Sequence, residues 1–360
     1  MNKKHVLLRG VLTLALLVVV LGAATTAKAQ KKTLHVYNWT TYIADNTISD
    51  FEKKFDVDVV YDTYADMSEM YAKFQAGNPG YDVVVPSYDY VPIMIKAGLL
   101  EELDLSKIPN FANLTESFKN PGYDPGNKYS IAYQWGTIGI GYNATKLGKD
   151  ITSFDDMFAP ELKGRISILE SQRETMSMFL HYLGKDANST DPADLEALKQ
   201  FFIEKKDWIV SFHEADAQFA IAKGDIDAAT VWSGDMLQVI ADPANKDLGL
   251  KYIIPAEGGL LWTDNLAIPK GAPELDLAYE FLNYILDPQV GADISNYTQY
   301  GTPNQASLDQ GLIDKELMDN PAIYPPKEVL EKCFTLTELD DAAQTLYDDT
   351  WAAIKAEVSQ

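Results

Sequence analysis

The sequence predicts an α/β protein with two lobes, and three observations carry this prediction. The first third alternates strand-like and helix-like segments, which is the order of a doubly wound sheet. About 330 residues remain once an N-terminal export segment is set aside, more than one ordinary core holds. No internal repeat or low-complexity linker divides the chain. We therefore expect compact lobes joined by strands rather than by a tether.

Residues 1–29 have the pattern of a secretory signal peptide. A basic start precedes an apolar stretch at 11–21, which is too short to span a bilayer. Ala27 and Ala29 then form the small-residue pattern of a cleavage site. We expect a mature chain that begins at Gln30 and is released into the periplasm.

The composition is strongly acidic, with 30 basic and 53 acidic side chains and a net charge of −23. The four basic residues of the signal segment leave with it, so the mature charge is −27. Such a surface repels nucleic acid and anionic lipid and attracts cations. The only cysteine, Cys333, is far from the cleavage site. We expect no lipid anchor, no internal disulfide and a monomer.

Each element of the first third follows from a local pattern. Asp66 to Glu69 resembles a capping box, and residues 81–85 form the continuous apolar run of a buried parallel strand. The expected order is strand 34–37, helix 47–55, strand 57–63, helix 66–74, strand 81–85 and helix 88–97.

Residues 129–142 are β-like and rich in glycine. Gly139, Gly141 and Ala144 have the spacing of a dinucleotide-binding fingerprint, but residues 145–150 lack the apolar period of a helix. We interpret the stretch as a crossing strand in which glycine permits close packing.

The remainder predicts a second α/β set. The expected elements are strand 165–169, helices 174–183, 192–205 and 216–222, strands 228–232, 250–254 and 266–269, and helices 273–286, 326–332 and 340–356. The chain leaves the first lobe near Thr137 and returns near Trp262, which predicts a hinge of paired strands. The expected lobes are 30–137 plus 262–303, and 138–261 plus 304–360.

Signatures of catalysis are missing from the sequence. His35, His181 and His213 are scattered without metal-ligand spacing, and no P-loop, nucleophile elbow or zinc-protease motif occurs. We therefore expect neither an enzyme nor a bound metal or cofactor.

Aromatic and acidic residues instead recur where elements end. Trp39 and Tyr42 follow the first strand, three residues apart, so a single turn would place them on one wall. The other members are Glu170, Glu174, Trp232, Asp235, Trp262, Asp264, Tyr297 and Tyr300. Aromatic faces attract an organic cation, and carboxylates give its ammonium ends charge-assisted hydrogen bonds. Any one of these residues could equally be core packing or a helix cap; together they favour a cation site.

Five stretches resemble the spermidine/putrescine-binding periplasmic proteins of polyamine ABC transporters. The stretches are 38–42 (NWTTY), 81–87 (YDVVVPS), 232–235 (WSGD), 262–269 (WTDNLAIP) and 300–304 (YGTPN). The resemblance covers the mature chain in order. It implies a type II periplasmic-binding-protein fold with a ligand cleft between two lobes, a polyamine ligand (putrescine, spermidine or both) and delivery to an inner-membrane permease.

The resemblance also implies which residues contact the ligand. The matching positions are Trp39, Thr40, Tyr42, Ser87, Glu174, Trp232, Asp235, Trp262, Asp264 and Tyr300. Asp264 matches the principal amine-binding acid, and Asp235 matches an acid of the putrescine-preferring branch. The chain departs from the family pattern at Thr41, Asp89 and Ser171, which leaves the choice of polyamine open.

Two alternatives stay open. The chain could be a receptor for another small organic cation or for a sugar. It could also be a glycoside hydrolase, because Glu174 and Asp264 could act as its two carboxylates.

Overall fold

The computed structural model describes residues 31–213 and 216–358. The proposed signal segment, 1–29, lies outside them. By its contacts the chain divides into a unit that ends at Lys32 and a second unit, Thr33–Gln360, which is described here by itself.

The first part of this unit alternates strand and helix as expected. Its elements are β1 (Thr33–Trp39), α2 (Thr47–Phe55), β2 (Asp58–Tyr64), α3 (Met67–Gln75), β3 (Val83–Val84) and α4 (Tyr90–Lys96). The Asp66 side chain caps α3 by accepting hydrogen bonds from Ser68 N and Glu69 N. Short 3₁₀ turns follow at Leu105–Lys107, Pro109–Asn113 and Glu116–Phe118.

The central strand β4 (Ser130–Asn143) leads into the second α/β set. Its elements are α5 (Ala144–Leu147), α6 (Phe154–Met157), β5 (Ile166–Leu169), α7 (Gln172–Tyr182), α8 (Pro192–Lys205), β6 (Ile209–His213), α9 (Ala217–Lys223), β7 (Ala228–Trp232), α10 (Ser233–Ala241) and β8 (Leu250–Ile253). Further 3₁₀ turns lie at Pro160–Leu162, Lys206–Trp208 and Pro243–Asn245.

Strand β9 (Leu260–Ala267) returns toward the first set, and helices complete the chain. They are α11 (Leu275–Ile285), α12 (Pro288–Thr298), α13 (Gln305–Asp309), α14 (Lys315–Met318), α15 (Lys327–Leu330) and α16 (Asp341–Val358). The last of these, α16, packs against α7 and α8.

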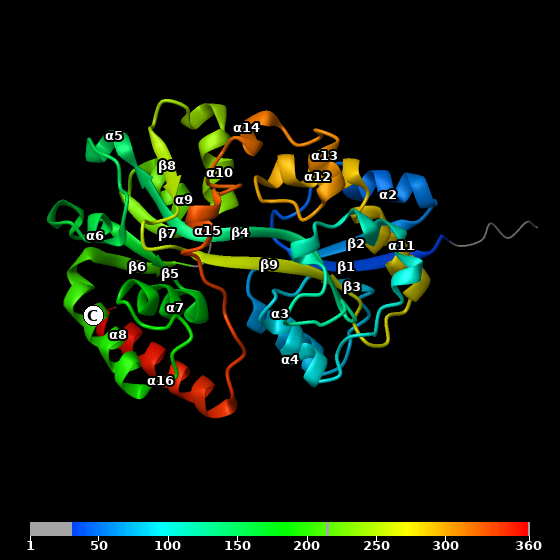
Figure 1. The fold of residues 1–360 in the computed structure, drawn as a ribbon, viewed down its shortest axis with the longest axis horizontal. Helices are drawn as coiled ribbons and strands as arrows, with labels where there is room; N and C mark the ends of the chain where they lie inside the picture. Colours follow the sequence, from blue (N-terminus) through cyan, green and yellow to red (C-terminus); the bar gives the residue numbers. More distant parts are fainter. Residues whose placement is uncertain (1–30, 214–215, 359–360) are drawn as a thin grey trace, which may run out of the picture. The chain divides into compact units, whose positions relative to one another are not determined.

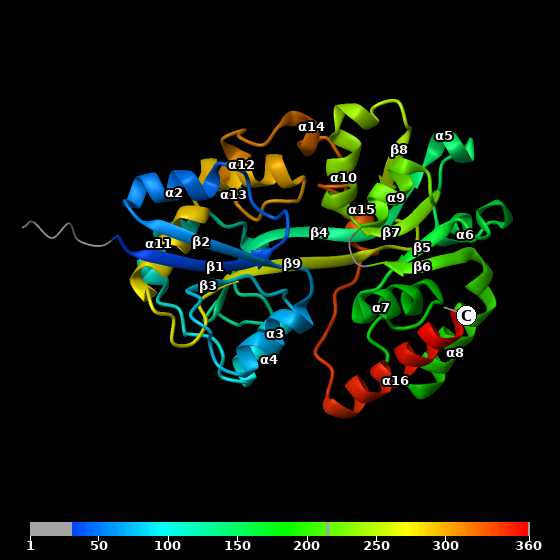
Figure 2. The same ribbon diagram turned by 180° about the vertical axis from the view of Figure 1, so that it is seen from behind.

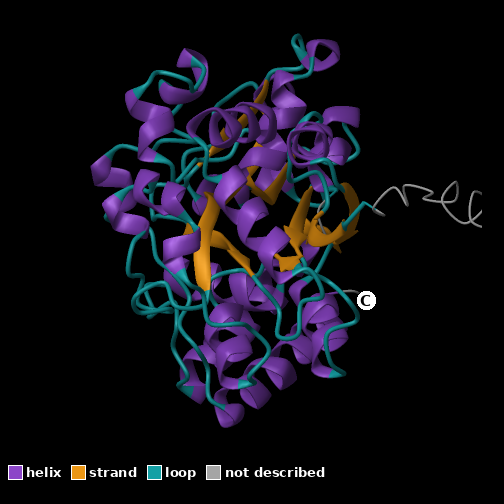
Figure 3. Ribbon diagram, turned by 90° about the vertical axis from the view of Figure 1, so that its right-hand side faces the viewer, coloured by secondary structure: helices purple, strands orange, loops and turns teal. Residues whose placement is uncertain are grey.

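One mixed sheet links the two sets of elements. Among the described residues its strand order is β2-β1-β3-β9-β4-β7-β5-β6, with β8 also paired to β4. β1 is parallel to β2 and β3, whereas β4 is antiparallel to β9, β7 and β8. Figures 1 and 2 show β4 and β9 running side by side between the two sets, and Figure 3 shows helices on both faces of the strands.

The pairing of β4 with β9 places the two expected crossing points together. Gly136 lies opposite Trp262, and Thr137 lies opposite Leu261. The first half of β4 pairs with β9, and its second half pairs with β7 and β8. These two strands therefore connect both sets of elements at one place.

Glycine lets β4 pack closely, as the sequence suggested. A Cβ at Gly139 would stand 2.2 Å from the carbonyl oxygen of Ile253. The expectation that no helix opens after this strand is wrong, because Asn143 caps the one-turn helix α5 by accepting a hydrogen bond from Lys146 N at 3.0 Å. The partners of β4 are antiparallel, so the strand–helix–parallel strand unit of a dinucleotide site is still missing.

Three further expectations differ from the structure. Strand β1 continues through Asn38 and Trp39 instead of ending at Tyr37. Strand β9 begins at Leu260, six residues before the expected start. No range was predicted from the sequence for β6, α6, α10, α12, α13 or α14.

Candidate functional site

Asp264 lies on β9 beside the end of β3. Its neighbour on β4 is Gln134, and a single bridge joins it to Ser87. Ser87 Oγ donates a 2.6 Å hydrogen bond to Asp264 Oδ1. The Asp264 residue is only 6% exposed. The sheet therefore carries a carboxylate into the interior at the point where the first parallel strands end.

Burial raises the pKa of Asp264 to about 7, and the nearby Glu174 carboxylate adds to the rise. The Ser87 and Tyr42 hydroxyls favour the charged form and offset part of this effect. Within the described residues no Lys or Arg forms an ion pair with Asp264. The carboxylate thus lacks the countercharge that buried acids usually have.

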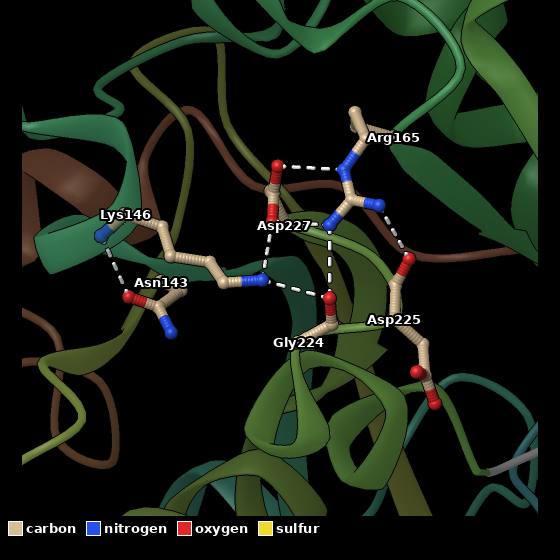
Figure 4. Close-up of polar contacts among 6 residues, drawn as sticks. All are labelled: Asn143, Lys146, Arg165, Gly224, Asp225 and Asp227. Atoms are coloured by element: carbon tan, nitrogen blue, oxygen red, sulfur yellow. Dashed lines mark hydrogen bonds and ion pairs between the residues drawn. The ribbon is translucent and has the colours of Figure 1, made fainter.

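Asp227, outside this region, shows what a compensated carboxylate looks like (Figure 4). Its two oxygens accept hydrogen bonds of 2.8 Å from Arg165 Nε and Nη2, and Lys146 Nζ lies 3.4 Å from Oδ1. These cations lower the pKa of Asp227. The contrast identifies Asp264 as an acid that the fold leaves available for a cation.

Four aromatic side chains pack next to Asp264 in edge-to-face or tilted pairs. The Trp262 and Tyr300 ring centroids are 5.0 Å apart, those of Trp232 and Trp262 are 5.6 Å apart, and those of Tyr42 and Tyr300 are 5.4 Å apart. Such faces can cover a methylene chain and attract a positive charge.

Two glycines make this close aromatic packing possible. A Cβ at Gly136 would stand 2.6 Å from Trp262 Cζ2 and 3.0 Å from Tyr300 Cδ1. A Cβ at Gly234 would stand 2.5 Å from Tyr300 Cε2. The glycine of the WSGD stretch therefore has a packing role beside the site.

Asp235 is the second acid of the group and lies in the first turn of α10. Tyr300 Oη donates to Asp235 Oδ1 at 3.0 Å, and the Asp235 amide donates to Tyr300 Oη at 3.3 Å. Burial raises the pKa of Asp235 to about 6, against the opposing effect of the Tyr300 hydrogen bond. Through Tyr300 it belongs to the same cluster as Trp262.

Glu174 and Asp89 form the third acidic position. Glu174, in the first turn of α7, accepts a 2.5 Å hydrogen bond from Ser171 Oγ, and burial raises its pKa. Burial and then the Glu174 charge raise the pKa of Asp89 to about 7, with a smaller rise from Asp264. Asp89 had no assigned role in the sequence reading. Its position two residues after Ser87 was the available signal.

Two buried polar atoms of the cluster have no hydrogen-bond partner among the described residues. They are Trp262 Nε1 and Tyr42 Oη, and both residues are 5% exposed. Tyr42 Oη lies close enough to Asp264 to affect its pKa, but not in hydrogen-bonding geometry. Polar groups of this kind are usually paired, so the cluster has unused hydrogen-bonding capacity.

The structure links most of the expected site residues directly, whereas the contacts of Trp39 and Thr40 are to other residues. Tyr42, Ser87, Trp232, Asp235, Trp262, Asp264 and Tyr300 are linked by ring contacts or hydrogen bonds, and Glu174 is linked electrostatically. Trp39 instead packs on Tyr64, and its Nε1 donates to Val85 O at 3.1 Å. Thr40 is exposed, and its Oγ1 donates to Tyr64 O at 3.3 Å.

Trp39 and Tyr42 do not lie on one helical turn, so their position on one wall of the site stays a prediction. Trp39 belongs to β1, and a turn follows in which Thr41 has a φ of 56°. This left-handed residue redirects the chain, and Tyr42 packs on Tyr133 at 5.5 Å. Spacing of three gives neighbouring side chains only on a helix.

Two further observations concern the described part of the chain. Within residues 31–213 and 216–358, no group of three or more His, Cys, Asp or Glu side chains is arranged to hold a metal ion. In the same ranges, no helix has the length and apolar character needed to cross a membrane.

Comparison with known proteins gives consistent matches. A family model for bacterial extracellular solute-binding proteins matches residues 46–325. The chain is 36% identical to the putrescine-binding periplasmic protein SpuD of Pseudomonas aeruginosa, over 91% of this chain and 93% of the relative. It is also 36% identical to the putrescine-binding periplasmic protein PotF of Escherichia coli, over 99% of both chains.

A solved structure matches over the same extent. The spermidine/putrescine ABC transporter substrate-binding protein PotD of Streptococcus pneumoniae superposes with a TM-score of 0.80 at 30% identity. The match covers 91% of this chain and 100% of that chain.

Proposed function

The chain belongs to the bacterial extracellular solute-binding protein family and has the two-lobe fold of periplasmic binding proteins. We propose that it binds a polyamine and delivers it to an ABC transporter permease. Its relatives are named for the binding of putrescine or spermidine. The solved relative is named as the substrate-binding protein of a spermidine/putrescine ABC transporter.

The observation that carries the proposal is the buried Asp264 and the half-buried Asp235, which form no ion pair with Lys or Arg among the described residues and lie beside aromatic rings, with a third acid, Asp89, near Glu174. Asp264, Asp235 and Asp89 each have a pKa raised mainly by burial, to about 7, about 6 and about 7. A polyamine supplies several ammonium groups separated by methylene segments. It can therefore supply countercharge to the acids while its apolar segments cover the rings.

We assign a role to each residue of the site. Asp264 and Asp235 accept hydrogen bonds from ammonium groups, and Glu174 accepts from a further amine. Ser87 positions the Asp264 carboxylate through its 2.6 Å hydrogen bond. Trp232, Trp262, Tyr300 and Tyr42 form the walls that contact methylene carbons. Trp39 and Thr40 are assigned to the site from the family pattern alone.

The two lobes close around the ligand by a hinge at β4 and β9. We assign residues 30–137 plus 262–303 to one lobe and 138–261 plus 304–360 to the other. The opposition of Gly136 and Trp262 across these strands supports a hinge at this point. Hinge closure of two lobes around a ligand is a common motion of such receptors.

Export and assembly complete the proposal. Residues 1–29 are removed as a signal peptide, and the mature protein is a periplasmic monomer. It has no lipid anchor, because its only cysteine, Cys333, lies far from the cleavage site. The mature charge of −27 disfavours nucleic acid as a partner.

Calorimetry of the purified mature protein tests the function directly. The titrants are putrescine, spermidine, arginine and a neutral sugar, each followed by product analysis. We expect saturable binding of putrescine or spermidine, weaker binding of arginine, no sugar binding and no turnover. Preferential binding of arginine or of the sugar would support a different receptor. Hydrolysis of a glycoside would support the enzyme in which Glu174 and Asp264 act as the carboxylate pair.

A further inference from the structure

Residues 334–338 connect α15 to α16 and pass between the two sets of elements. Figures 1 and 2 show this stretch as the orange-to-red trace that descends beside β9. Phe334 begins it with a parallel bridge to Leu260. Leu261 N donates to Phe334 O at 2.8 Å, and Phe334 N donates to Gly259 O at 3.1 Å. The stretch is therefore attached at its start to the edge of β9.

Side chains from α7 and the loop after it hold the same stretch by a dense set of hydrogen bonds. Asn188 Oδ1 accepts from Thr337 N at 2.9 Å, and Asn188 Nδ2 donates to Thr335 O at 2.9 Å. Arg173 Nη2 donates to Asn188 Oδ1 at 2.8 Å and to Thr337 O at 3.2 Å. The Arg173 guanidinium also lies over the Tyr347 ring, 4.7 Å from its centroid.

Among the described residues, two polar contacts join the first set of elements to residues 334–338. Leu336 N donates a 2.5 Å hydrogen bond to Tyr88 Oη, and both residues are buried. Lys96 Nζ lies 3.3 Å from Glu338 Oε1, but both side chains are largely exposed, so this pair contributes little. The Tyr88–Leu336 hydrogen bond is the principal polar link on this side.

These contacts lie next to the acids of the candidate site. Tyr88 directly precedes Asp89, and Arg173 directly precedes Glu174. Tyr88 is bonded to Leu336, whereas Arg173 is bonded to the adjacent residue, Thr337. One short stretch of chain therefore connects the backbone positions that present both carboxylates.

We propose that residues 334–338 form a latch that moves with the α7 side and holds the ligand-bound protein closed through the hydrogen bond from Leu336 N to Tyr88 Oη. Tyr88 is then a positioning residue, because it acts on Asp89 and on closure without contacting the ligand. The proposal rests on the polyamine-binding function proposed above.

The unequal anchoring of the stretch determines which rate the latch controls. Its bonds to Asn188, Arg173 and β9 do not depend on closure. In an open protein, Tyr88 Oη and Leu336 N–H would both face water. Hydrogen bonds to water would then replace the bond between them at little cost in free energy. The hydrogen bond therefore forms after the ligand has entered, and its loss accelerates release rather than slowing capture.

The variant Tyr88→Phe removes only the hydroxyl. Stopped-flow measurements with putrescine and with spermidine give association and dissociation rates, and calorimetry gives the ligand-free melting temperature. We expect dissociation about tenfold faster, the kinetic equivalent of about 1.4 kcal/mol, and association unchanged within about twofold. The ligand-free melting temperature should stay at the wild-type value, which a purely structural role would not allow.

Tyr279→Phe is the matched control. Tyr279 is also buried, and its hydroxyl also accepts a backbone N–H, from Asp104 at 2.9 Å, but both partners lie on one side of the hinge. This variant should lower the ligand-free melting temperature and leave the dissociation rate unchanged. Unchanged dissociation in Tyr88→Phe, or a loss of ligand-free stability as large as in the control, would overturn the latch alone. Absence of polyamine binding by the wild-type protein would overturn the proposed function as well.

Discussion

Replacing Asp264 with Asn removes the charge of the most buried site acid with little change in size. Ser87 Oγ, which donates at 2.6 Å, still finds an acceptor. Removing one partner of a buried charge pair costs about 3–5 kcal/mol. Because about 1.4 kcal/mol is a factor of ten, we expect polyamine binding at pH 8 to weaken by two orders of magnitude or more.

The stability of the ligand-free variant should respond in the opposite direction. The folded-state pKa of Asp264 is raised from 3.8 to about 7, so folding disfavours the charged form. The resulting cost is absent below the unfolded pKa, grows as the pH rises toward 7 and is constant above it. At about 1.4 kcal/mol per pKa unit, it reaches at most about 4 kcal/mol at pH 8 in the arrangement described here, and it is smaller where the lobes open and hydrate Asp264. Asn avoids this cost, so the melting temperature should not fall at pH 8, and the two proteins should converge toward pH 4.

Titration calorimetry for the dissociation constant and scanning calorimetry for the melting temperature measure both effects. Asp82→Asn is the matched control, because Asp82 is fully buried and accepts hydrogen bonds from His35 N at 2.8 Å and Glu274 N at 2.7 Å. It should lose stability and keep its affinity. If Asp264→Asn behaves like this control, Asp264 is a structural residue and the reasoning fails.

The other predictions concern pH, packing, processing and closure. Affinity for putrescine or spermidine should fall from pH 8 to pH 5.5, because the site acids become neutral. Asp264 and Asp89 have pKa values of about 7, and Asp235 has a pKa of about 6. Calorimetry at constant ionic strength measures the affinity, and a flat pH profile would contradict the prediction. Gly136→Ala should weaken polyamine binding at least tenfold, because the new Cβ would stand 2.6 Å from Trp262 Cζ2. Gly122→Ala is the control, because a Cβ there would have nothing within 4 Å. Equal affinities of the two variants would count against the aromatic walls. Mass spectrometry of the periplasmic fraction should give a mature chain that begins at Gln30, and an intact Met1 on membrane-bound material would refute cleavage. X-ray scattering should show a smaller radius of gyration with saturating polyamine, and identical profiles would argue for a preformed site.

The sequence predicted the α/β class, the family and the order of the early elements, because these depend on local patterns. The capping box at Asp66 and the apolar run before Ser87 are signals of this kind. The family assignment and the fold are both confirmed by the matches to polyamine-binding relatives. The lobe boundaries and the ligand contacts stay predictions.

The missed elements differ in their local signals. The helix α12 has a clear start in its Asp287 cap and Pro288, but the same pair is also typical of the end of the preceding helix. α10 begins directly after β7, its N-cap is Trp232 without a side-chain cap hydrogen bond, and Gly234 lies in its first turn. β6 follows a charged 3₁₀ turn at Lys206–Trp208 and buries its two ends but exposes its middle. α10 has no capping side chain at its start, whereas β6 has the β-branched and aromatic composition of a strand but is only five residues long.

The environment of the site acids could not be read from the sequence either. Asp264 is 6% exposed, and no local pattern around it in the sequence indicates this burial. Its burial depends on the Ser87 bridge and on rings brought close by Gly136 and Gly234, which come from distant parts of the chain. Only the folded arrangement determines such a pKa.

The absence of countercharge at these acids links stability to binding. Asp264 and Asp235 have raised pKa values because the fold buries them without Lys or Arg, whereas Asp227 has a lowered pKa beside Arg165. Unpaired carboxylates destabilise the closed arrangement at neutral pH when no ligand is bound. A bound polyamine supplies the missing positive charge, and a ligand that binds only the folded state stabilises it by mass action. A neutral solute of the same length would leave the acids unpaired, so the same feature that weakens the empty protein would select for cations.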